Sequence, residues 1–105
     1  MIIPKDAIIA DAKIRDYLLK PLEVDDKSGY LALAGYLRED YWELIRDIRD
    51  QLLPGDAIFQ ERDKFGEYYI LNGKVKGPNG RVLGVRTIWL REPDNRIRFL
   101  TLFPD

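Results

Sequence analysis

The chain has 105 residues, of which 46% are hydrophobic and 33% charged, and its formal net charge is −1. This composition is typical of one globular domain, and it excludes a disordered chain or a protein that binds nucleic acid through bulk positive charge. The chain has no cysteine and no histidine, which excludes disulfides, thiolate metal sites and catalytic centres built on either residue. We find no apolar run of about 20 residues and no signal-peptide pattern, so we expect a cytoplasmic protein without membrane contact.

The first expected helix covers residues 11–19. Its apolar stripe includes Ile14 and Tyr17, which recur at helical spacing. Asp11 is the expected N-terminal cap, because its carboxylate can accept the free amides of the first turn. Pro21 is expected to end the helix, because the residue before a proline is pushed out of the helical region.

Two further helices are expected, over residues 27–34 and 39–52. Asp25 or Asp26 would cap the first of these, an interpretation that we favour over weak cation binding by the pair, and Gly35 would end it. The helix over residues 39–52 has the most regular pattern. Its apolar face contains Tyr41, Leu44, Ile45, Ile48 and Leu52.

From residue 57 onward the hydrophobic pattern changes to the period of two that is typical of strands. Short segments rich in glycine, proline, aspartate and asparagine separate the strands, so each connection should be a hairpin. The sequence therefore predicts an α+β fold, in which three N-terminal helices pack on one face of a four-stranded antiparallel meander. The strands are expected at residues 57–62, 67–76, 81–92 and 96–103.

The stretch 81–92 is apolar on both of its alternating sets, which predicts a central strand buried on both faces. Trp89 and Ile88 should then be buried on opposite sides. Arg86 is a cation among apolar neighbours, and burying it unpaired would cost several kcal/mol. Arg86 is therefore either part of a structural ion pair or a residue of a functional site.

No acidic residues follow a metal-loop spacing, and the glycines of residues 77–80 lead into a strand rather than a helix, so we expect neither a metal nor a cofactor.

Basic and aromatic side chains do share the predicted sheet. They could hold RNA through phosphate contacts and base stacking, or they could simply keep the sheet soluble. These side chains are Lys74, Lys76, Arg86, Arg96, Arg98, Tyr68 and Tyr69.

Several short motifs, which together span nearly the whole chain, resemble a family of small bacterial domains of unknown function. The order of helices followed by a meander is also similar to barnase and to RelE-like ribonuclease toxins. The resemblance therefore implies a toxin-type or effector-type module. The motifs are Lys13–Leu19, Lys27 followed by Gly35-Tyr36, Trp42–Asp47, Gly77–Arg81, Thr87–Trp89 and Leu100–Pro104.

The resemblance also implies a set of candidate catalytic residues, with two lysines from the helices and three residues from the sheet. The sequence departs from the family at residues 23–26, where relatives tend to carry a loop with a histidine. Tyrosine or glutamate would therefore have to move protons in this chain. The candidates are Lys13, Lys27, Arg86, Thr87 and Thr101.

Two functions remain open from the sequence. The first is a module that binds a partner, either RNA or a neutralising protein encoded nearby. The second is a small metal-independent endoribonuclease in which lysine and arginine stabilise the transition state. The missing histidine and the slightly negative net charge favour the first.

Overall fold

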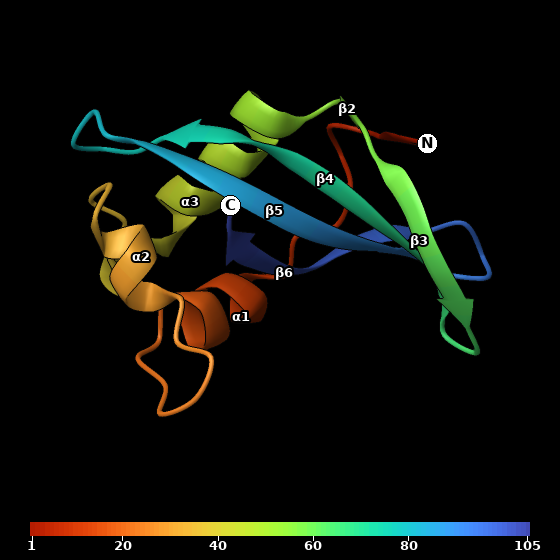
Figure 1. Ribbon diagram of the computed structural model, residues 1–105, viewed down its shortest axis with the longest axis horizontal. Coiled ribbons are helices and arrows are strands. Elements are labelled where there is room, and N and C mark those ends of the chain that lie inside the picture. The colour runs from red at the N-terminus through yellow and green to blue at the C-terminus, as the bar shows by residue number, and fades with distance from the viewer.

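The computed structural model describes residues 1–105 and has an α+β fold built on a four-stranded antiparallel sheet (Figure 1). The strands follow one another along the chain and across the sheet in the order β3-β4-β5-β6, which confirms the predicted antiparallel sheet and the central position of β5. Their bounds are β3 Ile58–Asp63, β4 Gly66–Lys76, β5 Val82–Arg91 and β6 Ile97–Pro104.

The register of the sheet is regular between β4 and β5, where pairing runs without a shift from Glu67↔Arg91 to Lys76↔Val82. Against β6 the register shifts between Ile88 and Trp89. The extra residue of this bulge lies on β6, because Ile88 pairs with Thr101 and Trp89 pairs with Phe99, which leaves Leu100 without a partner on β5. The hairpin turns use left-handed backbone at Gly80 (φ 88°) and Asn95 (φ 72°), as tight turns require.

The three helices expected from the sequence are not confirmed as continuous helices, because the helical residues form short segments of different types. The first stretch is α1 (Asp11–Lys13) followed by η1 (Ile14–Leu18), and α2 covers Ser28–Ala32. The third stretch consists of η2 (Arg38–Asp40), α3 (Tyr41–Asp47) and η3 (Ile48–Leu52).

The segments η1 and η3 are π-helical, and each widens the end of its helical stretch. A π turn brings residues i, i+4 and i+5 onto one face. In η1 these are Ile14, Leu18 and Leu19, all buried, and the Leu19 amide closes the turn by donating to the Ile14 carbonyl at 2.9 Å. The equivalent residues of η3 are also buried, namely Ile48, Leu52 and Leu53. The wider turn thus brings one more apolar side chain into the core at each place.

Neither predicted N-terminal cap occupies the cap position. Asp11 is not the N-terminal cap of α1, because Ala10 occupies that position and Asp11 is the first helical residue. There its carboxylate still lies at the positive end of the segment. Lys27 occupies the cap position of α2, and Asp26 lies one residue earlier, where its Oδ1 accepts hydrogen bonds from the Ser28 amide at 2.9 Å and the Ser28 hydroxyl at 2.6 Å.

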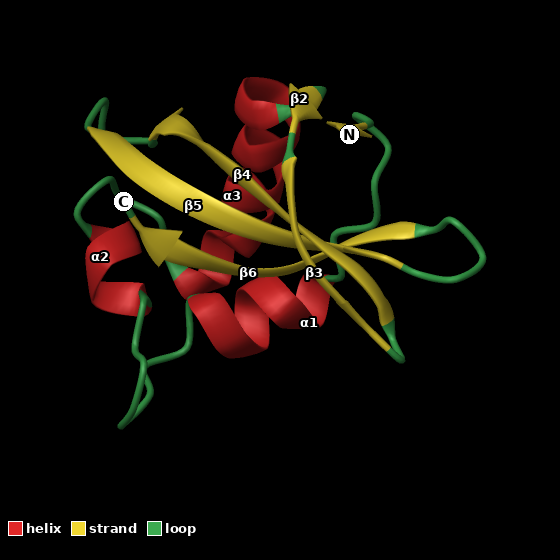
Figure 2. Cartoon of the chain, turned by 45° about the vertical axis from the view of Figure 1, so that its right-hand side comes forward, coloured by secondary structure: helices red, strands yellow, loops and turns green.

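The core lies between the helical segments and the inward face of the sheet. Figure 2 shows α3 behind β4 and β5. On the inward face, Trp89 and Phe99 are buried and pack edge to face with ring centroids 5.4 Å apart. Tyr36 reaches into the same layer, where its hydroxyl donates to Asp47 Oδ2 at 2.7 Å. Burial and the neighbouring Asp47 raise the pKa of Tyr36.

The outward face of the sheet differs from the sequence expectation, because β5 buries only one of its two faces fully. Leu83, Val85 and Thr87 point inward and are buried, whereas Val82 and Arg86 on the alternate set are exposed. No second layer of helices covers this side of the sheet (Figure 1). Arg86 is therefore a cation on an open sheet face and not a charge inside the core.

The N-terminal residues hold the opposite edges of the molecule together. The strand β1 (Ile2–Ile3) pairs antiparallel with β2 (Gly55–Asp56) in a separate two-stranded sheet. Further along, Ile8 makes a parallel bridge to Arg98 and so covers part of the free edge of β6.

None of the helices is long and apolar enough to cross a membrane.

Replacing Ile48 with alanine should lower the free energy of unfolding by about 2–5 kcal/mol, through lost burial and the cavity left behind. Ile48 is fully buried at the start of η3. The matched control is Val24→Ala on an exposed turn, which should change stability by no more than about 0.5 kcal/mol. Urea titration followed by circular dichroism measures both. Similar losses for the two variants would contradict the described core.

Candidate functional site

Lys27 is the one cationic residue among the buried residues, with only 6% of its surface exposed. It lies immediately before α2 and makes no ion pair with any carboxylate. Its Nζ instead donates a hydrogen bond to Tyr17 Oη at 2.8 Å. The same nitrogen lies 4.9 Å from the ring centroid of Tyr17 and 4.8 Å from that of Phe103. A buried lysine without a carboxylate is uncommon, so this residue marks the candidate site.

Tyr17 lies close to both lysines of the candidate site. It belongs to η1, its hydroxyl accepts the hydrogen bond from Lys27, and Lys13 Nζ lies 5.9 Å from its ring centroid. The hydrogen bond from Lys27 lowers the pKa of Tyr17, with a smaller contribution from Thr101, while burial and the charge of Asp25 act in the opposite direction. A phenol with a lowered pKa ionises more readily and is better able to transfer protons.

Thr101 on β6 supplies a further polar group beside Tyr17. Its Oγ1 is buried and makes no hydrogen bond of ordinary geometry, although it is close enough to Tyr17 to help lower the pKa of the phenol. An unpaired buried hydroxyl is costly. It can be satisfied by donating to the Tyr17 oxygen once that oxygen carries negative charge.

Arg86 extends the site across the sheet. It is the register partner of Phe103, and paired residues of antiparallel strands share a face, so Arg86 lies beside the ring that packs on Lys27. Its Nε donates to Asn72 Oδ1 at 3.3 Å, and its Nη2 lies 3.8 Å from Asp105 Oδ1. With the side chain 47% exposed, this long contact with Asp105 is not a buried structural ion pair.

Thr87 is the one candidate that the structure places away from the others. Its side chain lies on the inward face and is fully buried. The hydroxyl donates to the Leu71 carbonyl at 2.7 Å and accepts from Trp89 Nε1 at 2.8 Å. Both hydrogen-bonding capacities of the hydroxyl are thus used inside the core, and Thr87 acts there as the polar partner of a buried tryptophan.

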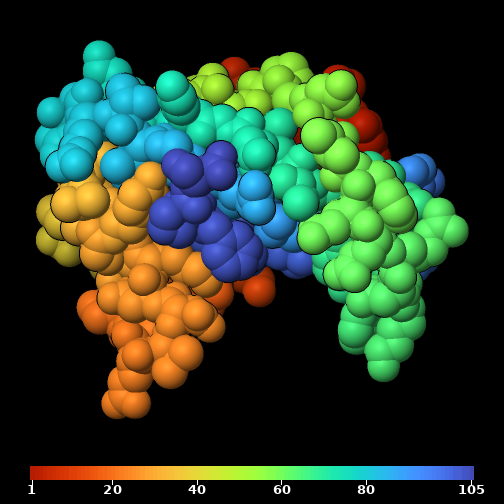
Figure 3. All heavy atoms as spheres, in the orientation of Figure 1, coloured from red at the N-terminus to blue at the C-terminus, as the bar shows by residue number.

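Two projecting segments flank the face that carries these residues. In Figure 3 the dark blue end of β6 lies in the middle of the view, between the orange segment that leads to α2 and the green strand β3. Both of these segments extend beyond it in this view. The exposed side chains of this face include Arg86 and Phe103.

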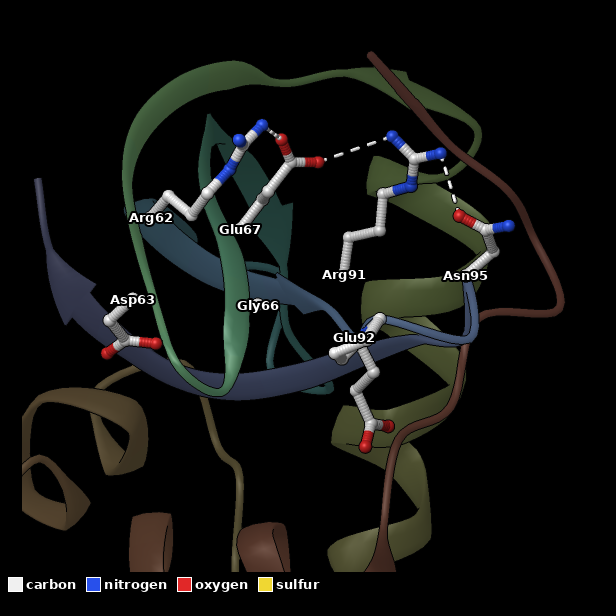
Figure 4. Close-up of a pocket in the computed structure, with 8 residues that line it drawn as sticks. Arg62, Asp63, Gly66, Glu67, Arg91, Glu92 and Asn95 are labelled. Carbon is white, nitrogen blue, oxygen red and sulfur yellow. Dashed lines mark hydrogen bonds and ion pairs between the residues drawn. The ribbon is translucent and has the colours of Figure 1, made fainter.

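The largest hollow in the molecule lies elsewhere, at the far end of the sheet, and has a volume of about 400 Å³ (Figure 4). Its two arginines are both engaged, because Arg62 and Arg91 contact Glu67, and Arg91 also donates to Asn95 Oδ1 at 2.8 Å. Its lining contains more carboxylates than cations, so it suits an anion poorly. The lining residues are Arg62, Asp63, Gly66, Glu67, Arg91, Glu92, Pro93 and Asn95.

The residues available near Lys27 suit oxyanion chemistry better than metal chemistry. No group of three or more carboxylates in the structure is arranged to hold a metal ion. Lysine and arginine side chains bind phosphate oxygens directly. A tyrosine with a lowered pKa can accept or donate a proton beside them.

Sequence reasoning missed two members of the site, Tyr17 and Phe103. Tyr17 was assigned to the apolar stripe of its helix, and Phe103 to a terminal motif. One signal was present, because Lys13 and Tyr17 are four residues apart and such residues are neighbours on a helix surface. No comparable signal links Phe103 to Lys27, since 76 positions separate them and only the fold brings them together.

A comparison with solved structures identifies a chain with a similar fold. The structure is similar to a chain from the solved structure described as "Contact-dependent growth inhibition toxin - immunity protein complex from Klebsiella pneumoniae 342". The TM-score is 0.65 at 15% sequence identity, and the match covers 94% of this chain and 100% of that chain. At this identity the likeness shows the fold alone.

A comparison of the sequence with known protein families identifies the family of this chain. Residues 4–105 match the family described as "Domain of unknown function (DUF6883)", and the chain belongs to this family. This confirms the resemblance to a small domain of unknown function, and the structural likeness shows that its fold also occurs in a toxin–immunity protein complex. Among curated proteins, none matches the sequence.

Replacing Lys27 with methionine should raise the pKa of Tyr17 toward its ordinary value of 10.0, because the hydrogen bond from Lys27 is the main cause of the lowering. The matched control is Lys64→Met, which removes another lysine that lies over an aromatic ring, that of Phe65 at 5.2 Å. Carbon NMR of the tyrosine rings against pH measures the titration, with Tyr17→Phe to assign the signal. An unchanged pKa in Lys27→Met would refute the described contact.

Proposed function

We propose that this chain is a metal-independent endoribonuclease of the toxin type, with its catalytic centre at Lys27 and Tyr17. The observation that carries the proposal is the nearly buried Lys27, which has no carboxylate partner and is hydrogen-bonded to a tyrosine of lowered pKa. A structural lysine would instead be expected to pair with an acidic side chain. An RNA substrate also implies activity in the cytoplasm.

RNA suits this centre because it carries its own nucleophile. The 2′-hydroxyl attacks the adjacent phosphorus, so that a bond forms from O2′ to phosphorus and the bond from phosphorus to O5′ breaks. The products are a 2′,3′-cyclic phosphate and a 5′-hydroxyl. This reaction needs a base, an acid and stabilisation of the charge on the phosphate oxygens, and all three can come from side chains.

The roles follow from the contacts. Tyr17, in its phenolate form, accepts the proton of the attacking 2′-hydroxyl, and the nearby Thr101 hydroxyl supports this form by donating to the phenolate oxygen. Lys27 stabilises the developing negative charge. Lys27 also passes a proton to the leaving 5′-oxygen, and its 2.8 Å contact with Tyr17 Oη allows the proton that Tyr17 has taken up to return to Lys27 after the reaction. Lys13, whose Nζ lies 5.9 Å from the centroid of the Tyr17 ring, adds positive charge for the phosphate.

Replacing Tyr17 with phenylalanine should lower kcat/KM for a single-stranded RNA oligonucleotide roughly 10²–10⁴-fold, because it removes the proton-transferring group. The native chain should cleave in the presence of EDTA and leave a 2′,3′-cyclic phosphate. Since the pKa of Tyr17 is lowered, the rate should rise with pH in a range below the ordinary titration of tyrosine. An oligonucleotide with a 2′-deoxy sugar at the scissile position should resist cleavage.

The control for this assay is Tyr68→Phe, because Tyr68 is bound to Asp63 Oδ2 at 2.9 Å near the β3–β4 turn and lies away from Lys27. This variant should cleave RNA as the native chain does. Equal activity of Tyr17→Phe and the native chain, or cleavage that EDTA abolishes, would refute the proposed mechanism.

We also infer a protein partner that neutralises the chain, which belongs to the first of the two functions left open by the sequence. The supporting observation is that the similar solved chain comes from a structure described as a toxin–immunity protein complex. Lys13, Lys27 and Arg86 give this part of the surface a positive character, so an acidic partner would be complementary to it.

A partner protein of this kind, encoded beside the chain, should co-purify with it and abolish RNA cleavage at an equimolar ratio. Charge reversal by Lys13→Glu should weaken the complex and make it less sensitive to salt, because rim charges act mainly through long-range attraction. Isothermal titration calorimetry at two salt concentrations measures this effect. Lys64→Glu at the opposite end of the molecule is the control. Equal effects of the two substitutions would contradict a partner placed over this face.

A further inference from the structure

The outward face carries an exposed aromatic ring directly beside the proposed catalytic lysine. Phe103 is 40% exposed, and Lys27 Nζ lies over its ring at 4.8 Å from the centroid. The neighbouring inward residue, Leu102, is fully buried, which fixes the outward direction of Phe103 because side chains alternate along a strand. The exposed part of the ring is therefore available on the same face as the catalytic groups.

The groups next to this ring are those that proteins use to bind an unpaired base. Arg86 is the register partner of Phe103 on β5, and Asn72 is the register partner of Arg86 on β4. The planar guanidinium of arginine stacks on bases as well as binding phosphate. Asn72 Oδ1 accepts the hydrogen bond from Arg86 Nε, which leaves the amide nitrogen of Asn72 to donate to a base edge.

The order of these side chains across the sheet matches the order of groups within a nucleotide chain. Lys27 at one side of Phe103 suits a phosphate, the ring suits the face of the adjacent base, and Arg86 and Asn72 lie beyond it on neighbouring strands. Lys74, exposed two residues further along β4, continues the positive charge on this side. These side chains thus place phosphate-binding groups next to base-binding groups along the open face of the sheet.

We propose that Phe103 is the stacking platform for one unpaired nucleobase, so that the substrate of the proposed ribonuclease site is single-stranded RNA. This inference rests on the proposed function, and it adds the strandedness of the substrate and the residue that reads it. In a duplex the faces of the bases are stacked on one another and cannot reach such a ring. Stacking on a ring selects for an accessible base rather than for one particular base.

The binding experiment uses a 2′-deoxy oligonucleotide that contains one 2-aminopurine, which cannot be cleaved and loses fluorescence when it stacks. The native chain should quench this fluorescence, and Phe103→Leu should abolish the quenching and weaken binding about ten-fold or more, as expected for the loss of one stacked base. Phe103→Trp should restore both. Circular dichroism confirms that each variant is folded.

The matched control is Phe65→Leu at the β3–β4 turn. Phe65 is 58% exposed and also has a lysine over its ring, Lys64 at 5.2 Å, yet it lies at the far end of the sheet from β6 (Figure 1). This variant should bind and quench as the native chain does. A fully paired hairpin of the same sequence should compete at least ten-fold less well than the single strand.

The outcomes separate this inference from the proposed function. If the native chain cleaves RNA but Phe103→Leu retains quenching and affinity, or if the hairpin competes equally well, the stacking platform is refuted and the ribonuclease remains. If the native chain binds and quenches the 2′-deoxy oligonucleotide through Phe103 but cleaves no RNA, the platform remains and the ribonuclease is refuted. If the native chain neither binds nor cleaves any oligonucleotide, both are refuted.

Discussion

The contact between the inward face of β5 and the helical segments determines how the other elements are arranged. Trp89 is fully buried there, its indole nitrogen donates to Thr87 Oγ1, and its ring packs on Phe99. The widened turns of η1 and η3 add apolar side chains to the same layer. Because interiors are close-packed, this layer fixes where η1 stands relative to β6. That position in turn brings Tyr17, on the rim of the core, to Lys27 and Thr101.

Lys27 is stabilised by groups that carry no negative charge. Two aromatic rings lie within 5 Å of its Nζ, and one tyrosine hydroxyl accepts its hydrogen bond. Cation–π contacts are worth about 0.5–2 kcal/mol each, which offsets part of the cost of burying the charge. The charge is not neutralised, however, so it remains free to attract an anion. An ion pair with a carboxylate would have stabilised the lysine and removed that capacity.

The fold and the family place different limits on function. The structural likeness at 15% identity shows a shared backbone arrangement, and one fold can support many activities. The family carries no assigned activity. The proposed function therefore depends on the side chains of this chain, in particular on Lys27, Tyr17 and Phe103 at the edge and open face of the sheet. The hollow near Glu67 is larger, but its charged groups are already paired.

The α+β fold, the four strands joined by hairpins and the absence of histidine and cysteine chemistry could be predicted from the sequence, because these depend on local periodicity, turn residues and composition. Alternation along a strand even required Arg86 and Thr87 to lie on opposite faces. Which of the two faces is open could not be predicted, since that depends on where the helical segments pack. The site itself also depends on this packing, because Tyr17, Lys27 and Phe103 come from three separate segments that only the folded chain brings together. Local sequence patterns do not predict such contacts. Lys27 could be named as a candidate from the sequence, but its contacts with Tyr17 and Phe103 could not.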